Sequence, residues 1–416
     1  MIKIKGMILA TTLLAAATAA TAQQTYRELI ETASLNRGVY GLRSMQDGEH
    51  YTAREGNAIV RHSYADASQQ NTLYTGTFSS YTLSPDETTL LLSSNHRPVY
   101  RHSFYADWQI VPLEGDGTAA MTLEGVRDVT LSPDSKRIAY LRFDESAVPT
   151  FEMMRYDGTL YNRPYSFKYP KAGDRNSTVE LWLYDIATGA KSRIDTGAET
   201  DQYLPRIDWT PAGELFYYRV NRKQNHFEVV LVHDDGTQKV IYDETSPTFV
   251  ERPDAGTIRF IDGERFIVLN ETATGWNHIY LYSTEKGLLN PVTSGPWQVT
   301  SVVETTDKAI YYISTETSPL RRNLYSIDYK GRHKKRLTEG DGTYSIAPSR
   351  GMKYYISTFS TAAEPNTVTL HKGDGTLLRT LATSDELAER MKQMPRKEFF
   401  TFVTERGDSL NAYMIK

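Results

Sequence analysis

A short turn motif recurs along this chain and constrains its fold more than any other feature. The turn is made of Ser, Thr, Pro, Asp or Gly, and a run of Leu, Ile, Val, Phe or Tyr follows it. Copies lie at residues 83–87, 131–135, 209–213, 261–263 and 347–349. Polar turns between short apolar runs are typical of antiparallel hairpins. The chain is therefore predicted to consist of many short strands.

A second marker gives the period of the repeat. Ile279, Leu324 and Thr369 occupy matching segments 45 residues apart, and Thr293 and Thr338 repeat at the same distance. A period in the forties with polar turns is typical of propeller repeats, and apolar residues do not recur at helical spacing. One blade cannot bury both of its faces, whereas blades stacked around an axis bury them together. We predict an all-β fold, a β-propeller of four-stranded antiparallel blades.

The repeat is interrupted in one place. Pro133 and Pro211 lie 78 residues apart, nearly twice the regular distance, and the excess at 144–173 is rich in aromatic residues. We expect an ordered arm that leaves the ring there. Helices are expected only at 26–34 and 384–393, the second with an N-cap Ser and acidic residues in its first turn. A strand pair is expected at 399–402 and 410–415.

The first residues have the pattern of an export signal. Two lysines precede an apolar run at 7–19, and Ala-Thr-Ala at 20–22 forms a cleavage site. We expect a signal peptide at 1–22 and a periplasmic or extracellular protein, because the run is too short to span a membrane. The chain has no Cys, which excludes disulfides and thiolate chemistry. A net charge of −4 without a basic face argues against nucleic-acid or membrane partners.

Several longer stretches carry a family resemblance. They are Tyr-Arg-His-Ser-Phe-Tyr-Ala-Asp-Trp at 100–108, Arg-Phe-Asp-Glu-Ser-Ala-Val-Pro at 142–149, Lys-Tyr-Pro-Lys-Ala-Gly at 168–173, and segments at 274–280 and 295–299. Together they resemble the N-terminal propeller of bacterial-type dipeptidyl peptidase IV, in the prolyl oligopeptidase family. The resemblance covers 25–416. It implies a propeller at 23–395 and, at 396–416, the start of a connection to an α/β-hydrolase domain that is absent from this chain.

The resemblance also implies a function. In that family the propeller caps the hydrolase and restricts access to short peptides, and the hydrolase carries the Ser, Asp and His that release N-terminal X-Pro dipeptides. No G-x-S-x-G occurs in this sequence, and Ser283 and Ser409 lie in polar turns. We therefore expect no catalytic residue, metal or cofactor here, and whether the chain is an enzyme stays open.

Candidate substrate-binding residues follow from matching positions. Arg101 matches an arginine that anchors a substrate carbonyl, a role suited to guanidinium donors; the alternative is an ion pair with Asp107. Glu251 and Arg252 resemble a segment that lines the pocket, or else form a solvated surface pair. Glu145 belongs to the arm and is interpreted as structural.

The resemblance implies that about one repeat is missing from the window where the family carries an adjacent glutamate pair that binds the substrate amine. No Glu-Glu pair lies between Trp108 and the turn at 131–135. We therefore expect about seven blades, against a family norm of eight, and a ring that either closes with fewer blades or stays open.

Two hypotheses follow. In the first, the chain is the substrate-gating propeller of a secreted serine peptidase, inactive alone, whose partners are a peptide, the hydrolase domain and a second copy bound through the 144–173 arm. In the second, it is a free-standing, non-catalytic propeller that binds a peptide or protein. Fold alone cannot separate them. A reading frame that continues beyond Lys416 into a nucleophile elbow would favour the first.

Overall fold

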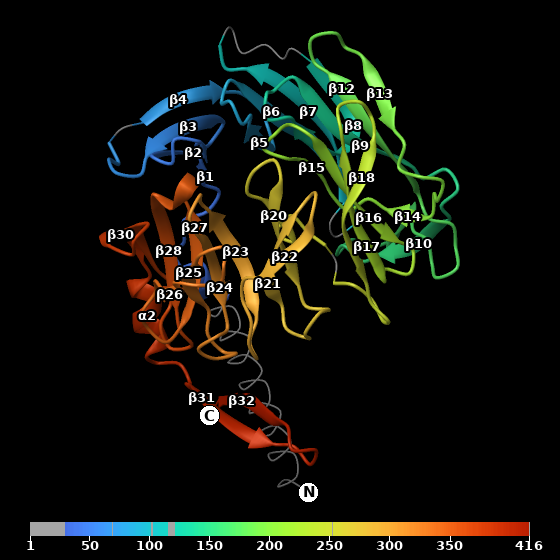
Figure 1. Ribbon diagram of the computed structural model, residues 1–416. Helices are drawn as coiled ribbons and strands as arrows, with labels where there is room; N and C mark the ends of the chain where they lie inside the picture. The colour runs from blue at the N-terminus through green and yellow to red at the C-terminus, as the bar shows by residue number, and fades with distance from the viewer. Residues whose placement is uncertain (1–29, 69, 101–102, 115–120, 252, 416) are drawn as a thin grey trace, which may run out of the picture.

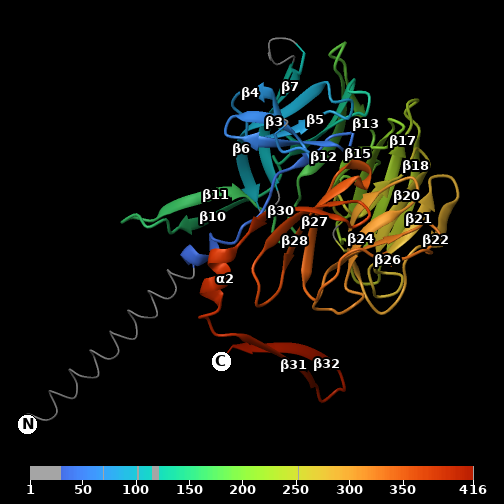
Figure 2. The same ribbon diagram turned by 90° about the vertical axis from the view of Figure 1, so that its left-hand side faces the viewer.

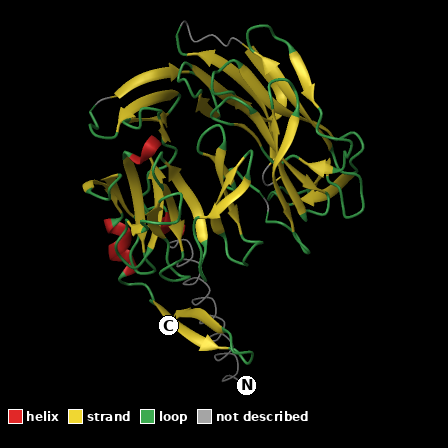
Figure 3. Cartoon of the chain, viewed as in Figure 1, coloured by secondary structure: helices red, strands yellow, loops and turns green. Residues whose placement is uncertain are grey.

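The computed structural model describes residues 30–415 apart from 69, 101–102, 115–120 and 252. The fold is nearly all-β, with 51% strand and 4% helix, as the sequence predicts (Figure 3). The signal peptide expected at 1–22, and the candidate residues Arg101 and Arg252, lie outside the described residues. Among the helices of the described part, none has the length and apolar character needed to span a bilayer.

Antiparallel sheets follow one another around a ring (Figure 1). Blade 1 contains β1 (Arg43–Ser44), β2 (His50–Glu55), β3 (Ala58–Ser63) and β4 (Gln70–Thr75). Blades 2 and 3 contain β5 (Ser80–Leu83), β6 (Thr89–Tyr100), β7 (Ser103–Pro112), β8 (Met121–Leu131), β9 (Arg137–Asp144), β12 (Thr178–Asp185) and β13 (Lys191–Ile194). Blade 4 contains β14 (Gln202–Tyr203), β15 (Ile207–Trp209), β16 (Leu215–Asn221), β17 (His226–Val232) and β18 (Gln238–Thr245).

The remaining blades have four strands each. Blade 5 contains β19 (Ile258–Phe260), β20 (Arg265–Asn270), β21 (His278–Ser283) and β22 (Gly287–Pro291). Blade 6 contains β23 (Val299–Thr305), β24 (Ile310–Ser314), β25 (Asn323–Ile327) and β26 (Lys335–Arg336). Blade 7 contains β27 (Thr343–Pro348), β28 (Tyr354–Ser360), β29 (Thr367–Lys372) and β30 (Leu377–Thr383), with the 3-10 turn η1 (Arg350–Met352) between its first two strands.

Blades 2 and 3 are fused through β8. The first half of β8 pairs with β7, and its second half pairs with β9, which makes one seven-stranded sheet. β8 is thus the outermost strand of blade 2 and the innermost strand of blade 3. With this shared strand the described part of the ring has seven blades, as expected from the missing repeat.

Seven hydrophobic clusters hold the ring together, one at each junction between consecutive blades. Strand alternation explains how a blade serves two junctions. On β16, Phe216 and Tyr218 pack toward blade 5, whereas Leu215 and Tyr217 pack toward blade 3. Each blade therefore depends on both neighbours for burial.

Blades 1 and 7 lie next to each other in the ring (Figure 1), and side-chain packing closes the ring between them. Tyr64 of blade 1 belongs to a cluster with Ile356 and Val368 of blade 7, and its ring stacks on Tyr354 at 5.6 Å. Arg379 donates to the carbonyl of Tyr64 at 3.1 Å. Of the two expected alternatives, a closed ring with fewer blades is the one that the described residues adopt.

The recurrent turns have a common physical basis. The Ser84 hydroxyl donates to Asp86 at 2.6 Å and accepts the Thr89 backbone N–H at 2.9 Å. Ser132 makes the same two contacts, with Asp134 and Arg137, at the same distances. These hydrogen bonds fix the hairpin between the first and second strands of a blade. Because they join residues close together in the chain, the turn can be recognised from the sequence.

The threonines of the 45-residue repeat also have a defined role. The Thr293 hydroxyl accepts the backbone N–H of Ile279 at 2.9 Å, and Thr338 does the same for Leu324 at 3.0 Å. Both hydroxyls are buried. Each one satisfies a backbone donor of a third strand that would otherwise lack a partner in the core.

Two hairpins leave the ring (Figure 2). The expected arm carries β10 (Thr150–Arg155) and β11 (Arg163–Lys168), which pair only with each other. After helix α2 (Asp385–Met391), the expected strand pair forms as β31 (Lys397–Val403) and β32 (Ser409–Ile415). The prediction that Ser384 caps helix α2 is wrong in one respect. Ser384 makes no side-chain capping bond, because its hydroxyl donates to the carbonyl of Asn366 at 2.9 Å.

Candidate functional site

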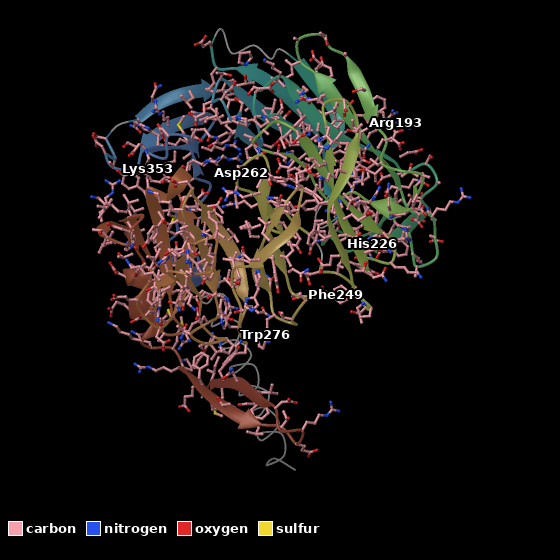
Figure 4. The ribbon with its side chains drawn as sticks, in the orientation of Figure 1. Arg193, His226, Phe249, Asp262, Trp276 and Lys353 are labelled. Carbon is pink, nitrogen blue, oxygen red and sulfur yellow. The ribbon has the colours of Figure 1, made fainter. Side chains whose placement is uncertain are left out.

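The order of strands within the blades determines which connections share an end of the ring. In an antiparallel blade, the connection from the second to the third strand and the one to the next blade lie at the same end. The β6–β7, β18–β19 and β20–β21 connections therefore share one end with the arm. Figure 4 shows Phe249 and Trp276 toward this end, whereas Asp262 and Lys353 lie toward the other. Both aromatic rings are exposed, Phe249 by 59% and Trp276 by 40%.

A cavity of about 400 Å³ lies at this end, between blades 4, 5 and 6. Its lining includes four carboxylate side chains, from Glu244, Glu251, Asp254 and Glu271. No Lys, Arg or His contributes to the lining among the described residues. The described lining is therefore charged by carboxylates alone, which favours a negative potential in the cavity.

Glu244, on β18, is held in the wall of the cavity by a chain of hydrogen bonds. It accepts from the Tyr242 hydroxyl at 2.8 Å and from the Thr272 hydroxyl. The Tyr242 oxygen in turn accepts from the Asn270 amide at 2.7 Å. Burial raises the pKa of Tyr242, and the adjacent Glu244 raises it further, so the phenol stays a donor. Glu244 is therefore a fixed part of the wall.

Glu251 contributes a more accessible carboxylate. It is exposed and lies between buried Val250 and buried Pro253, which fix its backbone at the cavity rim. Glu271, half-buried, follows directly after β20 on the next blade, blade 5. A site of this composition suits an ammonium or guanidinium group, for which carboxylates are the natural partners. The sequence singled out Glu251 but missed the other three acids.

A second polar cluster lies where β8 passes from one blade to the next. The Arg127 guanidinium is packed between the rings of Tyr105 and Phe143, at 4.1 and 4.3 Å from their centroids. It donates to Glu145 at 3.0 Å, and the Tyr105 hydroxyl donates to the same carboxylate at 2.8 Å. Glu145 therefore joins the start of the arm to two strands, in keeping with the structural role expected for it.

Asp128 is next to this cluster, at a bulge in β8. Its φ of 47° is left-handed, a conformation that Asp tolerates better than most residues. The side chain reaches solvent, yet the surrounding protein raises the pKa of its carboxyl, against the smaller opposing effects of Arg206 and Arg127. No sequence signal marked this residue.

The other candidate positions are only partly accounted for. Arg101 and Arg252 lie outside the described residues, so the structure neither joins them to the acidic cavity nor separates them from it. Asp107, the alternative partner considered for Arg101, contacts Asn95 at 2.8 Å and Arg97 at 3.7 Å. A larger cavity of about 850 Å³ is formed mainly by blade 7 and α2, and none of the candidate substrate-binding residues contributes to its described lining.

The fold and this end surface define the class of the protein: a seven-bladed antiparallel β-propeller with an acidic cavity among its loops. The family described as the dipeptidyl peptidase IV (DPP IV) N-terminal region matches residues 122–366. The chain belongs to this family, and the resemblance inferred from the sequence is confirmed.

Individual relatives agree with this assignment. The chain is 24% identical over 472 residues to dipeptidyl peptidase 4 of Trichophyton equinum, covering 93% of this chain and 61% of the relative. A crystal structure of Porphyromonas gingivalis dipeptidyl peptidase 4 matches with 30% identity and a TM-score of 0.78, over 90% of this chain and 64% of that one. A putative dipeptidyl aminopeptidase IV from Bacteroides ovatus shares the fold, with 19% identity and a TM-score of 0.67. The chain thus spans less than two thirds of the length of these proteins.

Proposed function

We propose that this chain is the substrate-admitting propeller of an exported dipeptidyl peptidase IV-like serine peptidase and that it hydrolyses no peptide by itself. The observation that carries the proposal is the acidic cavity at the end of the ring that also bears the β6–β7 hairpin. Membership of the family supports a peptide as the ligand. The sequence pattern at 1–22 supports export.

The proposed chemistry is recognition of a short peptide by its N-terminal end. Glu251 and Glu271 pair with the α-ammonium group. These two carboxylates take the place of the adjacent glutamate pair that the sequence lacks. Arg101 donates to a backbone carbonyl of the same peptide. Acyl transfer by a Ser-His-Asp triad, with release of X-Pro dipeptides, then belongs to a hydrolase domain outside these 416 residues.

Peptide binding tests this proposal directly. A fluorescent X-Pro peptide with a free amine is titrated into the purified chain, alongside the same peptide acetylated at its N-terminus. We expect the free amine to bind at least about tenfold more tightly, since loss of one charge-assisted contact costs about 1.5–3 kcal/mol. Equal binding of the two peptides would contradict the proposal.

Variants locate the binding site within the ring. The double variant Glu251→Gln and Glu271→Gln keeps the shape of the cavity and removes two charges, so it is expected to abolish the preference for the free amine. Glu285→Gln, an exposed carboxylate paired with Lys239 at 2.8 Å, is the control and is expected to change nothing. A Gly-Pro chromogenic dipeptide substrate should show no turnover with any of these proteins. Measurable hydrolysis would refute the proposal that the chain hydrolyses no peptide by itself.

We also propose that the arm joins two copies of the chain. Its tip exposes Tyr156 by 79%, Leu160 by 90% and Tyr161 by 80%. Apolar side chains gathered on a projecting hairpin are typical of an interaction surface. Light scattering is expected to give a dimer mass for the unmodified chain and a monomer mass for Leu160→Asp with Tyr161→Asp. A dimer that survives both substitutions would exclude the arm tip as the contact.

A further inference from the structure

Three potential metal ligands converge on the outer strands of blade 4. They are His226 and Glu228 on β17 and Asp243 on β18, and one ligand atom from each lies within 4.8 Å of the other two. The His226 Nε2 and an Asp243 oxygen are 2.9 Å apart. Figure 4 shows His226 on this blade, to one side of the loops that bear Phe249 and Trp276. The cluster is separate from the acidic cavity, since none of the three residues lines it.

A β-bulge brings the three side chains to one face of the sheet. Residues two apart on a strand share a face, which accounts for His226 and Glu228. The register between β17 and β18 shifts between Val229 and Val230, and Glu228 then pairs with Asp243. Without the shift Glu228 would pair with Tyr242, and Asp243 would point to the opposite face.

Neighbouring groups hold the ligands in orientation. Arg219 donates to one oxygen of Glu228 at 2.7 Å, which leaves the other oxygen available. This hydrogen bond is the main cause that raises the pKa of Arg219. The backbone N–H of His226 donates to the Asn221 side chain at 3.2 Å, which fixes the start of the strand. Contacts of this kind orient the ligands of established metal sites.

The chemistry of the ligands selects the ion. Imidazole nitrogen and carboxylate oxygen are both ligand types that Zn²⁺ accepts, and three protein ligands leave the fourth tetrahedral position for water. Mg²⁺ and Ca²⁺ prefer oxygen ligands alone. His226 is 38% exposed and Asp243 58%, so an ion can enter without opening the blade. The two carboxylates, Glu228 and Asp243, outnumber the one guanidinium paired with them, that of Arg219, which favours the binding of a cation.

We propose that His226, Glu228 and Asp243 bind one Zn²⁺ ion, which fastens the outermost strand of blade 4 to its neighbour. The chain has no cysteine, so a disulfide cannot supply such a link. A bound ion ties β17 to β18 in the native state only, and it therefore stabilises the folded chain by mass action.

Titration with zinc chloride after chelator treatment tests the site in the full chain. We expect one Zn²⁺ per chain by calorimetry and a rise in melting temperature that depends on zinc concentration. His226→Ala and Asp243→Asn are each expected to raise the Kd for Zn²⁺ more than about tenfold. Loss of a ligand should weaken metal affinity at least as much as loss of a residue that only hydrogen-bonds a ligand. Cobalt substitution should give visible absorption bands in the unmodified chain that both variants lack.

A matched control is available on the same blade. His233 and Glu214 form a histidine–carboxylate pair at 2.7 Å, and no third ligand joins them among the described residues. His233→Ala should leave zinc affinity unchanged, with circular dichroism confirming that each variant is folded. Unchanged affinity in His226→Ala, or an equal loss in His233→Ala, would overturn the proposal.

Discussion

Replacement of Glu145 by Gln tests the idea that the fused part of the ring depends on one buried ion pair. The Arg127 side chain is only 8% exposed and Glu145 24%, and their charged groups are 3.0 Å apart. Glu145→Gln leaves the Arg127 charge in place, packed between two aromatic rings, without its partner. Breaking a fully buried pair costs about 3–5 kcal/mol. Because Glu145 retains some solvent contact and Gln can still accept one hydrogen bond, we expect a loss of about 2–3 kcal/mol in unfolding free energy.

The measurement is urea unfolding of the chain, followed by tryptophan fluorescence and extrapolated to zero denaturant. Glu285→Gln is the control, because it breaks a pair of similar length, 2.8 Å, whose Lys239 is 36% exposed. That variant should lose less than about 1 kcal/mol. Equal losses in the two variants would refute the argument. A double variant, Arg127→Met with Glu145→Leu, should be more stable than Glu145→Gln, since it leaves no unpaired charge.

Three further outcomes are expected. Burial opposes ionisation of Asp86, but hydrogen bonds from Ser84, Ser135 and Thr88 outweigh this effect and lower the pKa of the carboxyl from 3.8 to about 2. The contribution of the Asp86 carboxylate to folding stability is therefore complete above about pH 4 and is lost as the pH falls through 2. Unfolding measured across this range should show Asp86→Asn about 1 kcal/mol less stable at pH 6, a value discounted for the exposure of the carboxylate, with the difference vanishing near pH 2. Thr338→Val should lower the unfolding free energy by about 1–3 kcal/mol, because it leaves the buried N–H of Leu324 without an acceptor. Thr338→Ser keeps the hydroxyl, so a calorimetric melt should show no comparable loss of stability. At a fixed Zn²⁺ concentration that saturates the unmodified chain, the zinc-induced rise in melting temperature should be smaller in Asp243→Asn than in the unmodified chain, whereas an equal rise would count against the site in blade 4.

The sequence predicts the blades well because a blade is defined by local chemistry. Turns such as the one at Ser84 and Asp86 are closed by neighbours in the chain, so their composition is visible without knowledge of the fold. The 45-residue spacing of Thr293 and Thr338 is visible for the same reason, since each contacts a strand in its own blade. The arm and the final hairpin follow from interruptions of that period.

Pairings between distant segments could not be predicted in this way. Each half of β8 reads as an ordinary strand, and nothing in its residues indicates that it serves two sheets. The acidic cavity draws Glu244 and Glu251 from one side and Glu271 from the next blade, so no sequence spacing unites them. The metal cluster depends on a bulge that moves Asp243 to the face of Glu228. Register is a property of the pair of strands, not of either strand alone.

The shared strand β8 has a consequence for how the ring comes apart. The junction at β8 is crossed by ladders of backbone hydrogen bonds on both edges of the strand, whereas the other described junctions are held mainly by side-chain packing, with a few backbone hydrogen bonds such as the one from Tyr344 to the carbonyl of Arg322. Blades 2 and 3 are therefore expected to open as a single cooperative unit, and only blade 1 separates this unit from the seam between blades 1 and 7. Backbone amides of β7 and β9 should exchange with solvent only through a common opening, while the amides of blade 7 exchange through a separate and cheaper one. The shared strand thus makes blades 2 and 3 the segment of the ring that we expect to open last.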